Sequence, residues 1–555
     1  ALNKAALAII AVFAIAYVAP LGVRPMVMPD ETRYGEIPRE MIESGNWVAP
    51  RLDGLHYYEK PVFGYWLNAL SIMILGENAF AVRLPAALSA GLSALLIFLL
   101  ARRFAGGPTA GILSAAILLS CFLPFAIGVF SVLDSQLSSF LTGTMVCFFF
   151  AYKETRAARK MLYLAACGVF CGLAFLTKGF LAFMVPVVVV VPFLAWERQW
   201  KDFLRLPWIP MLAALLVALP WSIAIHLQDN DFWRYFFFEE HIARALNPSG
   251  GQHPEPFWFF IPIFMAGALP WLLLLPAAVR KAGRIDRTSL LRFAICWFIF
   301  PFIGFSMSSG KLGTYILPCF PPFAALTAVA LIAYFARGAK RLFNAGAILC
   351  AVMLGLIATT LLVAQVTSVF SELLIKVGGG PHPYANGETW KAAVCIGALV
   401  AAIVLVIIAA CASNMHRKLT CFALSPVIVM FAMHFIVPAA ASEGKAPGEF
   451  LMMHAEEVEP NSILVSNNYM APGVCWFFKR TDVYIAGGGG ELTYGLKRAD
   501  DERLLSPDQF AELIRENAGK RKILYFTHHI EPEMAAALPQ PAAQMESHGF
   551  TFVRY

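Results

Sequence analysis

The sequence is poor in charged residues. Only 14% of its 555 residues are Asp, Glu, Lys or Arg, and 59% are hydrophobic. A soluble domain carries about 25% charged residues. This deficit excludes an ordinary soluble protein and indicates that lipid solvates most of the chain. The net charge of +7 is modest for this length, so we expect no nucleic acid as a partner.

The sequence also lacks a cysteine pattern typical of a zinc ribbon or a redox pair. Ten of its 11 cysteines lie in apolar stretches, and only Cys475 lies in the polar C-terminal region. We expect small buried side chains, and no disulfide within the C-terminal region. No small-residue cleavage site follows the apolar stretch at 5–21, so we interpret it as a membrane helix rather than a signal peptide.

Long apolar segments make up most of the chain. A spanning helix needs about 20 apolar residues, and the sequence predicts an α-helical polytopic membrane protein with about 13 such helices. They lie at residues 5–22, 84–101, 108–125, 135–152, 161–177, 180–196, 208–226, 257–279, 293–308, 312–335, 342–365, 391–412 and 419–440.

Basic residues fall in alternate loops. Cytoplasmic loops are rich in Lys and Arg, which orients the chain with its N-terminus in the cytoplasm. The segment 62–75 would invert every later loop if it spanned, so we interpret it as a juxtamembrane helix in the interface. The loops predicted to be cytoplasmic contain Arg102 and Arg103, 153–160, 198–205, 280–287, 337–341, and Arg417 and Lys418.

This orientation predicts two domains. Residues 1–442 form a transmembrane domain whose outer loop, 23–83, carries juxtamembrane helices. Residues 443–555 are polar, with short apolar runs at 462–467, 482–487, 522–528 and 550–555 that predict strands. Ser506 and Pro507 open a helical pattern over 506–517. We expect a soluble periplasmic α/β domain.

The outward-facing side carries ionisable residues at membrane depth, where charge is costly and by default indicates function. Lys178 and Lys311 lie in Gly-containing turns against the positive-inside bias. Tyr315 follows Lys311 by one helical turn, on the same face. The candidate catalytic carboxylates are Asp30, at the end of the first helix, Glu59, and Asp134, at the end of the third. The candidate residues for binding substrate and phosphate are Arg33, Tyr34, Tyr57, Tyr58, Lys60, Lys178, Arg244, Lys311 and Tyr315.

Each candidate also has a structural interpretation. Lys178 and Lys311 could snorkel at helix ends, Asp30 and Asp134 could cap helices, and the tyrosines could belong to the interface or the core. Taken together, however, the cations fit an anionic ligand such as a phosphate. Cations, two carboxylates and aromatic walls suit glycosyl transfer from a polyprenyl phosphate, because cleavage at the anomeric carbon leaves negative charge on the phosphate.

The run PDETRYGEIPREMIESGNWVAPRLDGLHYYEKPVFGYWLNAL (29–70) resembles the first outer loop of the C-type glycosyltransferases. The likeness continues in SVLDSQ (131–136), TKGFLA (177–182), DFWRYFFFEEHIARAL (231–246), PFWFFIPIFMAGALPWLLLLP (256–276), GKLGTYILPCF (310–320), SEGKAPGEF (442–450) and GELTYGL (490–496). The chain is most similar to the 4-amino-4-deoxy-L-arabinose lipid A transferase (ArnT) branch of the protein O-mannosyltransferase-like superfamily.

This resemblance implies transfer of aminoarabinose from undecaprenyl phosphate to a lipid A phosphate, with inversion, on the periplasmic face of the bacterial inner membrane. It implies lipid A modification and resistance to cationic peptides such as polymyxin. Asp30 matches the family's proposed catalytic acid/base. The positions that match expected phosphate ligands are Lys60, Lys178, Arg244, Lys311 and Tyr315. Thr32 and Arg33 depart from the acid pair of protein mannosyltransferases, which suggests an anionic acceptor.

Several alternatives stay open. Asp30 could position the acceptor rather than act as a base, since a phosphate monoester is already charged at neutral pH. Glu59 and His241 could bind a divalent cation such as zinc, although their spacing matches no metal motif; we expect no organic cofactor. Glu491 and Tyr494 are assigned a structural role. A related transferase with another sugar or acceptor, a lipid-linked sugar transporter and a membrane scaffold are the rival functions. We expect a monomer.

Overall fold

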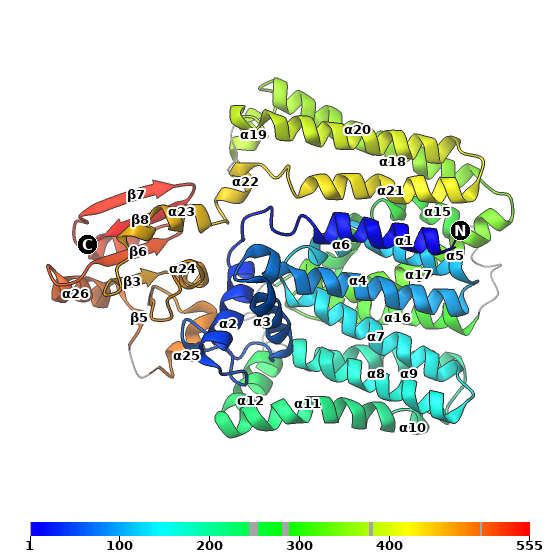
Figure 1. Cartoon of the computed structure of the whole chain (residues 1–555), viewed down its shortest axis with the longest axis horizontal. Helices are drawn as coiled ribbons and strands as arrows, with labels where there is room; N and C mark the ends of the chain where they lie inside the picture. The colour runs from blue at the N-terminus through cyan, green and yellow to red at the C-terminus, as the bar shows by residue number, and fades with distance from the viewer. Residues whose placement is uncertain (1, 244–253, 280–287, 377–380, 500–501) are drawn as a thin grey trace. The chain divides into compact units, whose positions relative to one another are not determined.

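The computed structural model describes residues 2–243, 254–279, 288–376, 381–499 and 502–555. The chain divides into two compact units (Figure 1). The helical unit comprises Ala1–Leu21, Leu84–Val366 and Thr389–Ile436, and the α/β unit comprises Gly22–Arg83, Thr367–Glu388 and Val437–Tyr555. The α/β unit therefore combines the predicted outer loop with the predicted C-terminal domain, and the proposed boundary at 442/443 stays a prediction.

The helical unit consists of apolar helices, most of which run roughly side by side in Figure 1. They are α1 (Leu2–Phe13), η1 (Ala14–Val18), α4 (Ala79–Phe104, which begins in the α/β unit), α5 (Pro108–Leu119), α6 (Phe122–Gly128), α7 (Leu133–Lys153), α8 (Ala157–Lys178), α9 (Leu181–Trp196), α10 (Asp202–Arg205), α11 (Trp208–Gln228), α12 (Phe232–Arg234), η2 (Tyr235–Ala243), η3 (Phe257–Phe259), α14 (Phe260–Gly267), η4 (Trp271–Leu274), α15 (Leu275–Val279), α16 (Ser289–Met307), η6 (Gly313–Cys319), α17 (Phe320–Ala336), α18 (Arg341–Val366), α20 (Thr389–Cys411) and α21 (Met415–Met433).

The membrane character of the chain is confirmed, whereas the number of spans stays a prediction. Within the described ranges, seven helices are long and apolar enough to cross a membrane, or nine if two bent pairs each count as one span. Both pairs were expected as single segments. The segment at 108–125 breaks between α5 and α6 with a bend of 67°, and the segment at 257–279 breaks before Trp271 with a bend of 88°.

Small residues let α8 and α11 approach closely. Gly168 and Gly172 form a G-x-x-x-G pattern on α8. A Cβ at Gly172 would lie 2.8 Å from Val217 Cβ, and one at Gly168 would collide with the Pro210 carbonyl oxygen. Close packing of this kind holds helices together in lipid, where the hydrophobic effect between helices is weak.

The first part of the α/β unit is built around α2 (Asp30–Ser44), which packs against α3 (Phe63–Leu75). The hairpin β1 (Arg51–Leu52) and β2 (Leu55–His56) joins them. Its two-residue turn, Asp53-Gly54, has positive φ at both positions, the conformation of a type I′ turn. At 13 residues α3 is shorter than the seven spanning candidates, but so are the helices over the predicted spans 5–22 and 180–196, and the interpretation of α3 as non-spanning stays a prediction. Its exposed Leu70, Met73 and Ile74 suit an interfacial helix.

The remainder of the α/β unit contains a six-stranded sheet in the order β5-β4-β3-β6-β8-β7. The first four strands are parallel, and β8 pairs antiparallel with both β6 and β7. The elements are α19 (Ser371–Lys376), η7 (Asn386–Glu388), α22 (Ala439–Glu443), α23 (Gly448–Met453), η8 (Ala455–Glu457), β3 (Ile463–Ser466), α24 (Ala471–Phe478), β4 (Tyr484–Ala486), η9 (Gly490–Leu492), α25 (Thr493–Leu496), β5 (Leu504–Leu505), α26 (Pro507–Asn517), β6 (Ile523–Thr527), α27 (Pro532–Ala537), β7 (Ala543–Ser547) and β8 (Phe550–Arg554).

Helices cover both faces of this sheet. Along β6, Leu524 and Phe526 belong to a core cluster that contains Val474 of α24, whereas Tyr525 belongs to a second cluster that contains Phe510 of α26. Strands that are buried on both faces appear in the sequence as continuous runs of apolar residues. The four predicted strands and the predicted helix at 506–517 are therefore confirmed, and Ser506 forms a full capping box with Gln509.

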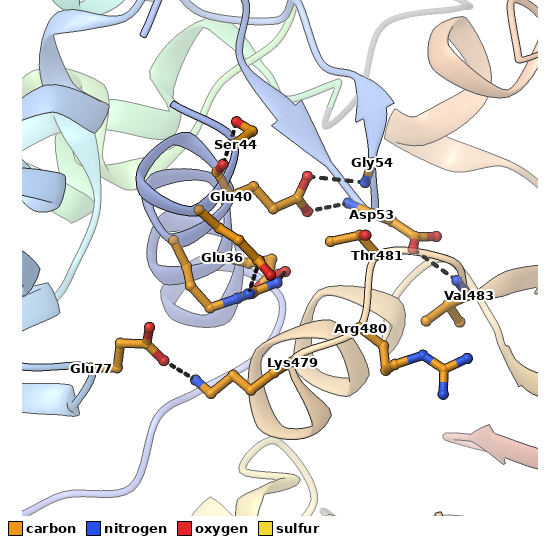
Figure 2. Close-up of polar contacts among 12 residues, drawn as sticks. Glu36, Glu40, Ser44, Asp53, Gly54, Glu77, Lys479, Arg480, Thr481 and Val483 are labelled. Carbon is orange, nitrogen blue, oxygen red and sulfur yellow. Dashed lines mark hydrogen bonds and ion pairs between the residues drawn. The ribbon is translucent and has the colours of Figure 1, made fainter. Parts of the chain in front are cut away.

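Buried charge attaches α2 to the hairpin (Figure 2). Both carboxylate oxygens of Glu40 accept backbone N–H bonds across the turn, from Asp53 at 2.6 Å and from Gly54 at 3.0 Å. One helical turn earlier, Glu36 binds Arg39 through two hydrogen bonds of 2.6 and 2.7 Å. Burial, foremost, and the neighbouring Glu36 raise the pKa of Glu40, and the Gly54 N–H opposes them. The two N–H donors thus offset part of the cost of a carboxylate at this position.

We expect Glu40→Ala to lower the free energy of unfolding by about 2–3 kcal/mol, because two N–H groups of the turn lose their acceptors. Glu40→Gln should cost less, since the amide oxygen still accepts one of the bonds. Thermal unfolding of the purified protein measures the change. The control is Glu512→Gln on α26, because the Glu512 side chain is exposed. Equal melting of Glu40→Ala and the control would contradict the role given to Glu40.

Candidate active site

The α/β unit gathers several predicted residues around Arg33; we name Asp30, Arg33, Tyr57 and Glu491 the Arg33 cluster. Asp30 is the first residue of α2, and Arg33 follows one turn later. Arg33 donates from Nη2 to Asp30 and from Nη1 to Glu491 and, at 3.3 Å, to the Tyr57 hydroxyl. Tyr57 in turn donates to Glu491 Oε2 at 3.0 Å. Residues more than 400 positions apart thus share one hydrogen-bonded group.

Burial controls the protonation of this cluster. Arg33 and Tyr57 are buried, whereas the Asp30 side chain is 40% exposed and the Glu491 side chain 32% exposed. Burial by itself would lower the pKa of Arg33, but nearby Tyr57, Tyr34 and Asp30 outweigh it, so the pKa lies well above its usual value. Burial raises the pKa of the Tyr57 hydroxyl, with Arg33 opposing it. A charged arginine therefore holds two carboxylates that a ligand can reach.

The other predicted residues of the outer loop surround this cluster. The Arg33 guanidinium lies 5.1 Å from the centroid of the Tyr34 ring. The Tyr58 hydroxyl lies 2.6 Å from His56 Nδ1, and its ring contacts Tyr494. Glu59 is buried, and Lys60 Nζ lies 3.9 Å from its carboxylate. The loop therefore places aromatic rings beside charged groups.

The helical unit forms a second group, the Lys178 cluster, from Asp134, Lys178 and Tyr315. Lys178 is the last residue of α8, and its Nζ donates to Asp134 Oδ1 at 2.7 Å. The same ammonium lies 4.6 Å from the centroid of the Tyr315 ring, in cation–π contact. The ammonium is thus fixed between an acid and an aromatic face, which argues against a side chain that only snorkels to water.

Two details of the prediction for this cluster are wrong. Asp134 does not end a helix; it lies in the first turn of α7, where the N-cap is Val132 and no side chain caps the helix. Tyr315 is not one helical turn from Lys311, because Lys311 lies in a non-helical stretch after the bridge between Gly310 and Pro254, and η6 begins only at Gly313. Lys311 is buried and donates to the Glu255 carbonyl oxygen at 2.6 Å.

Two candidates are not tested by the geometry. Arg244 lies outside the described residues, and His241 lies in η2 with a side chain outside the described part of the chain. Over the residues described, no three His, Cys, Asp or Glu side chains gather as metal ligands would. The proposed cation site at Glu59 and His241 therefore stays a prediction.

The structure also identifies residues that sequence reasoning undervalued or missed. Glu491, assigned a structural role, lies in the Arg33 cluster. Arg83 is fully buried and binds Glu31 through two hydrogen bonds of 2.6 Å, while donating to the carbonyls of Arg24 and Pro25. A lone arginine in the apolar run of α4 was the available signal for this ion pair.

Comparison with known proteins identifies the family. Residues 3–236 match the family model for dolichyl-phosphate-mannose-protein mannosyltransferase, and residues 442–554 match that for the arabinosyl transferase ArnT C-terminal domain. The fold is that of ArnT from Cupriavidus metallidurans, crystallised bound to undecaprenyl phosphate, with a TM-score of 0.82, 23% identity and coverage of 99% of this chain and 97% of that one.

Curated relatives match the chain over nearly its whole length. The undecaprenyl phosphate-alpha-4-amino-4-deoxy-L-arabinose arabinosyl transferase of Shewanella sediminis is 37% identical, covering 98% of this chain and 96% of the relative. The second transferase of that name in Proteus mirabilis is 36% identical with the same coverage. The chain therefore belongs to the undecaprenyl phosphate-4-amino-4-deoxy-L-arabinose arabinosyl transferases, a family of membrane glycosyltransferases.

Proposed function

We propose that this protein transfers 4-amino-4-deoxy-L-arabinose from undecaprenyl phosphate to a phosphate of lipid A, with inversion at the anomeric carbon. The names of its relatives give the donor and the sugar, and the Cupriavidus protein of the same fold binds undecaprenyl phosphate. A sugar with a free amine added to lipid A lowers the negative charge of the membrane surface, which weakens the attraction of cationic peptides such as polymyxin.

The Lys178 cluster is the observation that carries the chemistry. When the bond between the anomeric carbon and the donor phosphate oxygen breaks, the phosphate keeps the electron pair and gains negative charge. An ammonium fixed between Asp134 and Tyr315 can stabilise that charge without reorganising. The acceptor phosphate oxygen then forms the new bond on the opposite face of the sugar.

Asp30 suits a positioning role. A phosphate monoester carries a charge of about −1.5 to −2 at neutral pH, so the acceptor needs little deprotonation. The Asp30 carboxylate accepts a hydrogen bond from Arg33 and remains partly exposed. It can therefore orient Arg33, and through it the anionic acceptor, without removing a proton.

The proposal includes a location and an assembly state. The alternation of basic loops supports an N-terminus in the cytoplasm, and an active site and C-terminal domain on the periplasmic side of the inner membrane. A monomer suffices, because both clusters are formed within one chain. Two alternative functions stay open. One is an enzyme of the same kind that transfers another sugar or uses another acceptor, and the other is a transporter of lipid-linked sugars.

Mass spectrometry of lipid A from cells with and without the protein tests the proposal. We expect a mass increment equal to aminoarabinose that depends on the protein. Transfer between two detergent-solubilised lipids by the purified protein, with no gradient present, separates an enzyme from a transporter. An unchanged lipid A together with no transfer in detergent would contradict the proposed function.

The role of Asp30 predicts a difference between two substitutions. Asp30→Ala should lower kcat/KM at least about 100-fold, the usual effect of losing a group that orients charge in the transition state. Asp30→Asn should keep most of the turnover, since its amide oxygen still accepts from Arg33. The exposed Asp508→Asn on α26 is the control. Equal loss in both Asp30 variants, recovered at higher pH for a less acidic acceptor, would instead identify a general base.

The Lys178 cluster predicts non-additive effects. Lys178→Met should lower kcat/KM by about 10²–10³, because the leaving phosphate loses its cation. Asp134→Ala should also lower it, but should add little in the Lys178→Met background, since Asp134 acts by holding Lys178. The exposed Lys201→Met serves as the control. If the losses in kcat/KM of the two single variants instead multiply in the double variant, Asp134 takes part in catalysis independently of Lys178.

We propose that side-chain cations, rather than a required divalent metal ion, neutralise the phosphates, and that no organic cofactor takes part. The Glu59 carboxylate already has Lys60 Nζ at 3.9 Å, so its charge is balanced within the chain. We therefore expect sugar transfer to survive exhaustive chelation, with metal analysis confirming removal. Lost activity that returns with zinc but not with magnesium would favour a zinc site at Glu59 and His241. The Glu59→Gln variant should then bind less zinc.

A further inference from the structure

A groove lies in the helical unit beside α16 and α17, which pack together (Figure 1). Its volume is about 810 Å³, within the range of about 300–1,000 Å³ typical of sites that bind small molecules. Both arms of the bent pair at 257–279 line it, with Phe264 from α14 and Leu275 from α15. The 88° bend between these arms therefore lies beside a hollow that the described helices leave unfilled.

The lining of this hollow, which we name the α16 groove, is apolar. Phe264 is buried, and its ring contacts those of Phe298 and Phe323 at centroid distances of 5.1 and 5.2 Å. Ile299 and Ile303 of α16 also line the groove and are exposed. An open apolar hollow between membrane helices suits an acyl chain of a lipid, because lipid tails rather than water surround helices at this depth.

One end of the α16 groove carries a charge. Arg292 lines the groove near the start of α16, and between Arg292 and Ile303 the helix rises about 16 Å. This length is close to one leaflet, half of the roughly 30 Å hydrocarbon core. Trp196 at the end of α9 lines the same end and is exposed, and tryptophans gather at the level of the lipid headgroups.

Hydrogen bonds to Glu197 hold Arg292 in place. Glu197 Oε1 accepts from Arg292 Nη1 at 3.0 Å, and Glu197 Oε2 accepts from the hydroxyls of Ser289 at 2.9 Å and Tyr152 at 3.1 Å. Lys153 donates to the Ser289 hydroxyl at 2.8 Å. The guanidinium therefore belongs to a built polar cluster at the end of an apolar groove.

Half of this guanidinium has no partner among the described residues. The bond to Glu197 uses Nη1, whereas Nε is buried without an acceptor and Nη2 donates to no described residue. The Nε and Nη2 edge of an arginine is a fork that can bind two phosphate oxygens at once. Buried donors are normally satisfied, so this edge of a side chain that is 31% exposed indicates an acceptor that binds there.

The surrounding charge favours an anion. The segment 153–160 carries four basic residues and one acidic residue, and the segment 196–206 carries three basic residues and two acidic ones, Glu197 and Asp202. Arg292 adds a further cation. A surplus of positive charge next to the membrane attracts anionic headgroups, whereas a zwitterionic headgroup gains less from it.

We propose that the α16 groove binds an anionic phospholipid of the leaflet at the Arg292 end. An acyl chain fills the groove along α16, and the phosphate accepts hydrogen bonds from the Nε and Nη2 edge of Arg292. None of the described residues that line the groove belongs to the Lys178 cluster. The lipid therefore supports the bent pair at 257–279 and takes no part in sugar transfer, so the site does not depend on the proposed function.

Binding of two lipids to the purified full-length protein tests the site. Dioleoyl phosphatidylglycerol is the anionic probe and dioleoyl phosphatidylethanolamine is the zwitterionic one, and native mass spectrometry in detergent measures the apparent Kd of each. Arg292→Gln removes the cation, whereas Ile299→Trp fills the groove and changes no charge. Arg341→Gln is the matched control, because Arg341 is an exposed arginine at the start of α18 and does not line the groove.

We expect the wild type and Arg341→Gln to bind one phosphatidylglycerol with the same Kd, and to bind phosphatidylethanolamine more weakly. Arg292→Gln should raise the Kd for phosphatidylglycerol about 10- to 100-fold, as for a lost hydrogen bond to a charged group. Ile299→Trp should weaken the binding of both lipids. An unchanged Kd in Arg292→Gln, or equal binding of the two lipids by the wild type, would overturn the inference.

Glu197→Gln separates lipid binding from internal support. Because Arg292 loses its carboxylate partner in this variant, phosphatidylglycerol should bind at least as tightly as to the wild type. An Arg292 that only holds Glu197 would make both variants melt earlier and leave the Kd unchanged. Equal weakening in Arg341→Gln would indicate general attraction of anionic lipid. Displacement of phosphatidylglycerol by undecaprenyl phosphate in the wild type but not in Arg292→Gln would identify the donor lipid as the occupant. Each of these three results would overturn the inference.

Discussion

The bidentate ion pair between Arg83 and Glu31 fixes the start of α2, and the candidate site of the α/β unit depends on that start. A buried ion pair repays its desolvation only when its remaining donors also find partners. Arg83 meets this condition through the carbonyls of Arg24 and Pro25. The guanidinium, the carboxylate and the two carbonyls would each lose a partner if one of them moved. The loop before α2 and the first turn of α2 are therefore fixed relative to each other. Asp30 and Arg33 lie in that turn.

The same requirement recurs along α2. Its buried face carries Glu36, Arg39 and Glu40 where an ordinary helix would carry apolar residues. Each finds a specific partner: Arg39 binds Glu36, and Glu40 binds the turn of the hairpin. An apolar face tolerates sliding, whereas a satisfied polar face does not, since any shift leaves a buried charge unpaired. A rigid α2 is the kind of support that holds a catalytic group within about 0.5 Å of its working position.

Much of the fold follows from local sequence patterns. The runs 462–467 and 522–528 are apolar on both faces, and they are the buried strands β3 and β6. The bends in the helices near residues 120 and 270, and the non-helical backbone at Lys311, were not predicted, because the spacing of apolar residues continues unbroken through all three places. Some members of each cluster could be proposed from the sequence, because Asp30 and Arg33 in one cluster, and Asp134 and Lys178 in the other, are charges in costly places. Their partners were harder to predict. The same holds for Glu40 on α2: Asp53-Gly54 is a dipeptide typical of a type I′ turn, but nothing near it in the sequence connects that turn to Glu40.

Glu491 shows why partners are harder to predict than charges. It lies in a polar segment where a glutamate costs nothing, so its own surroundings give no sign of function, and it is 458 positions from Arg33. Only the sheet topology brings it there, because a parallel strand delivers its following loop to a fixed edge.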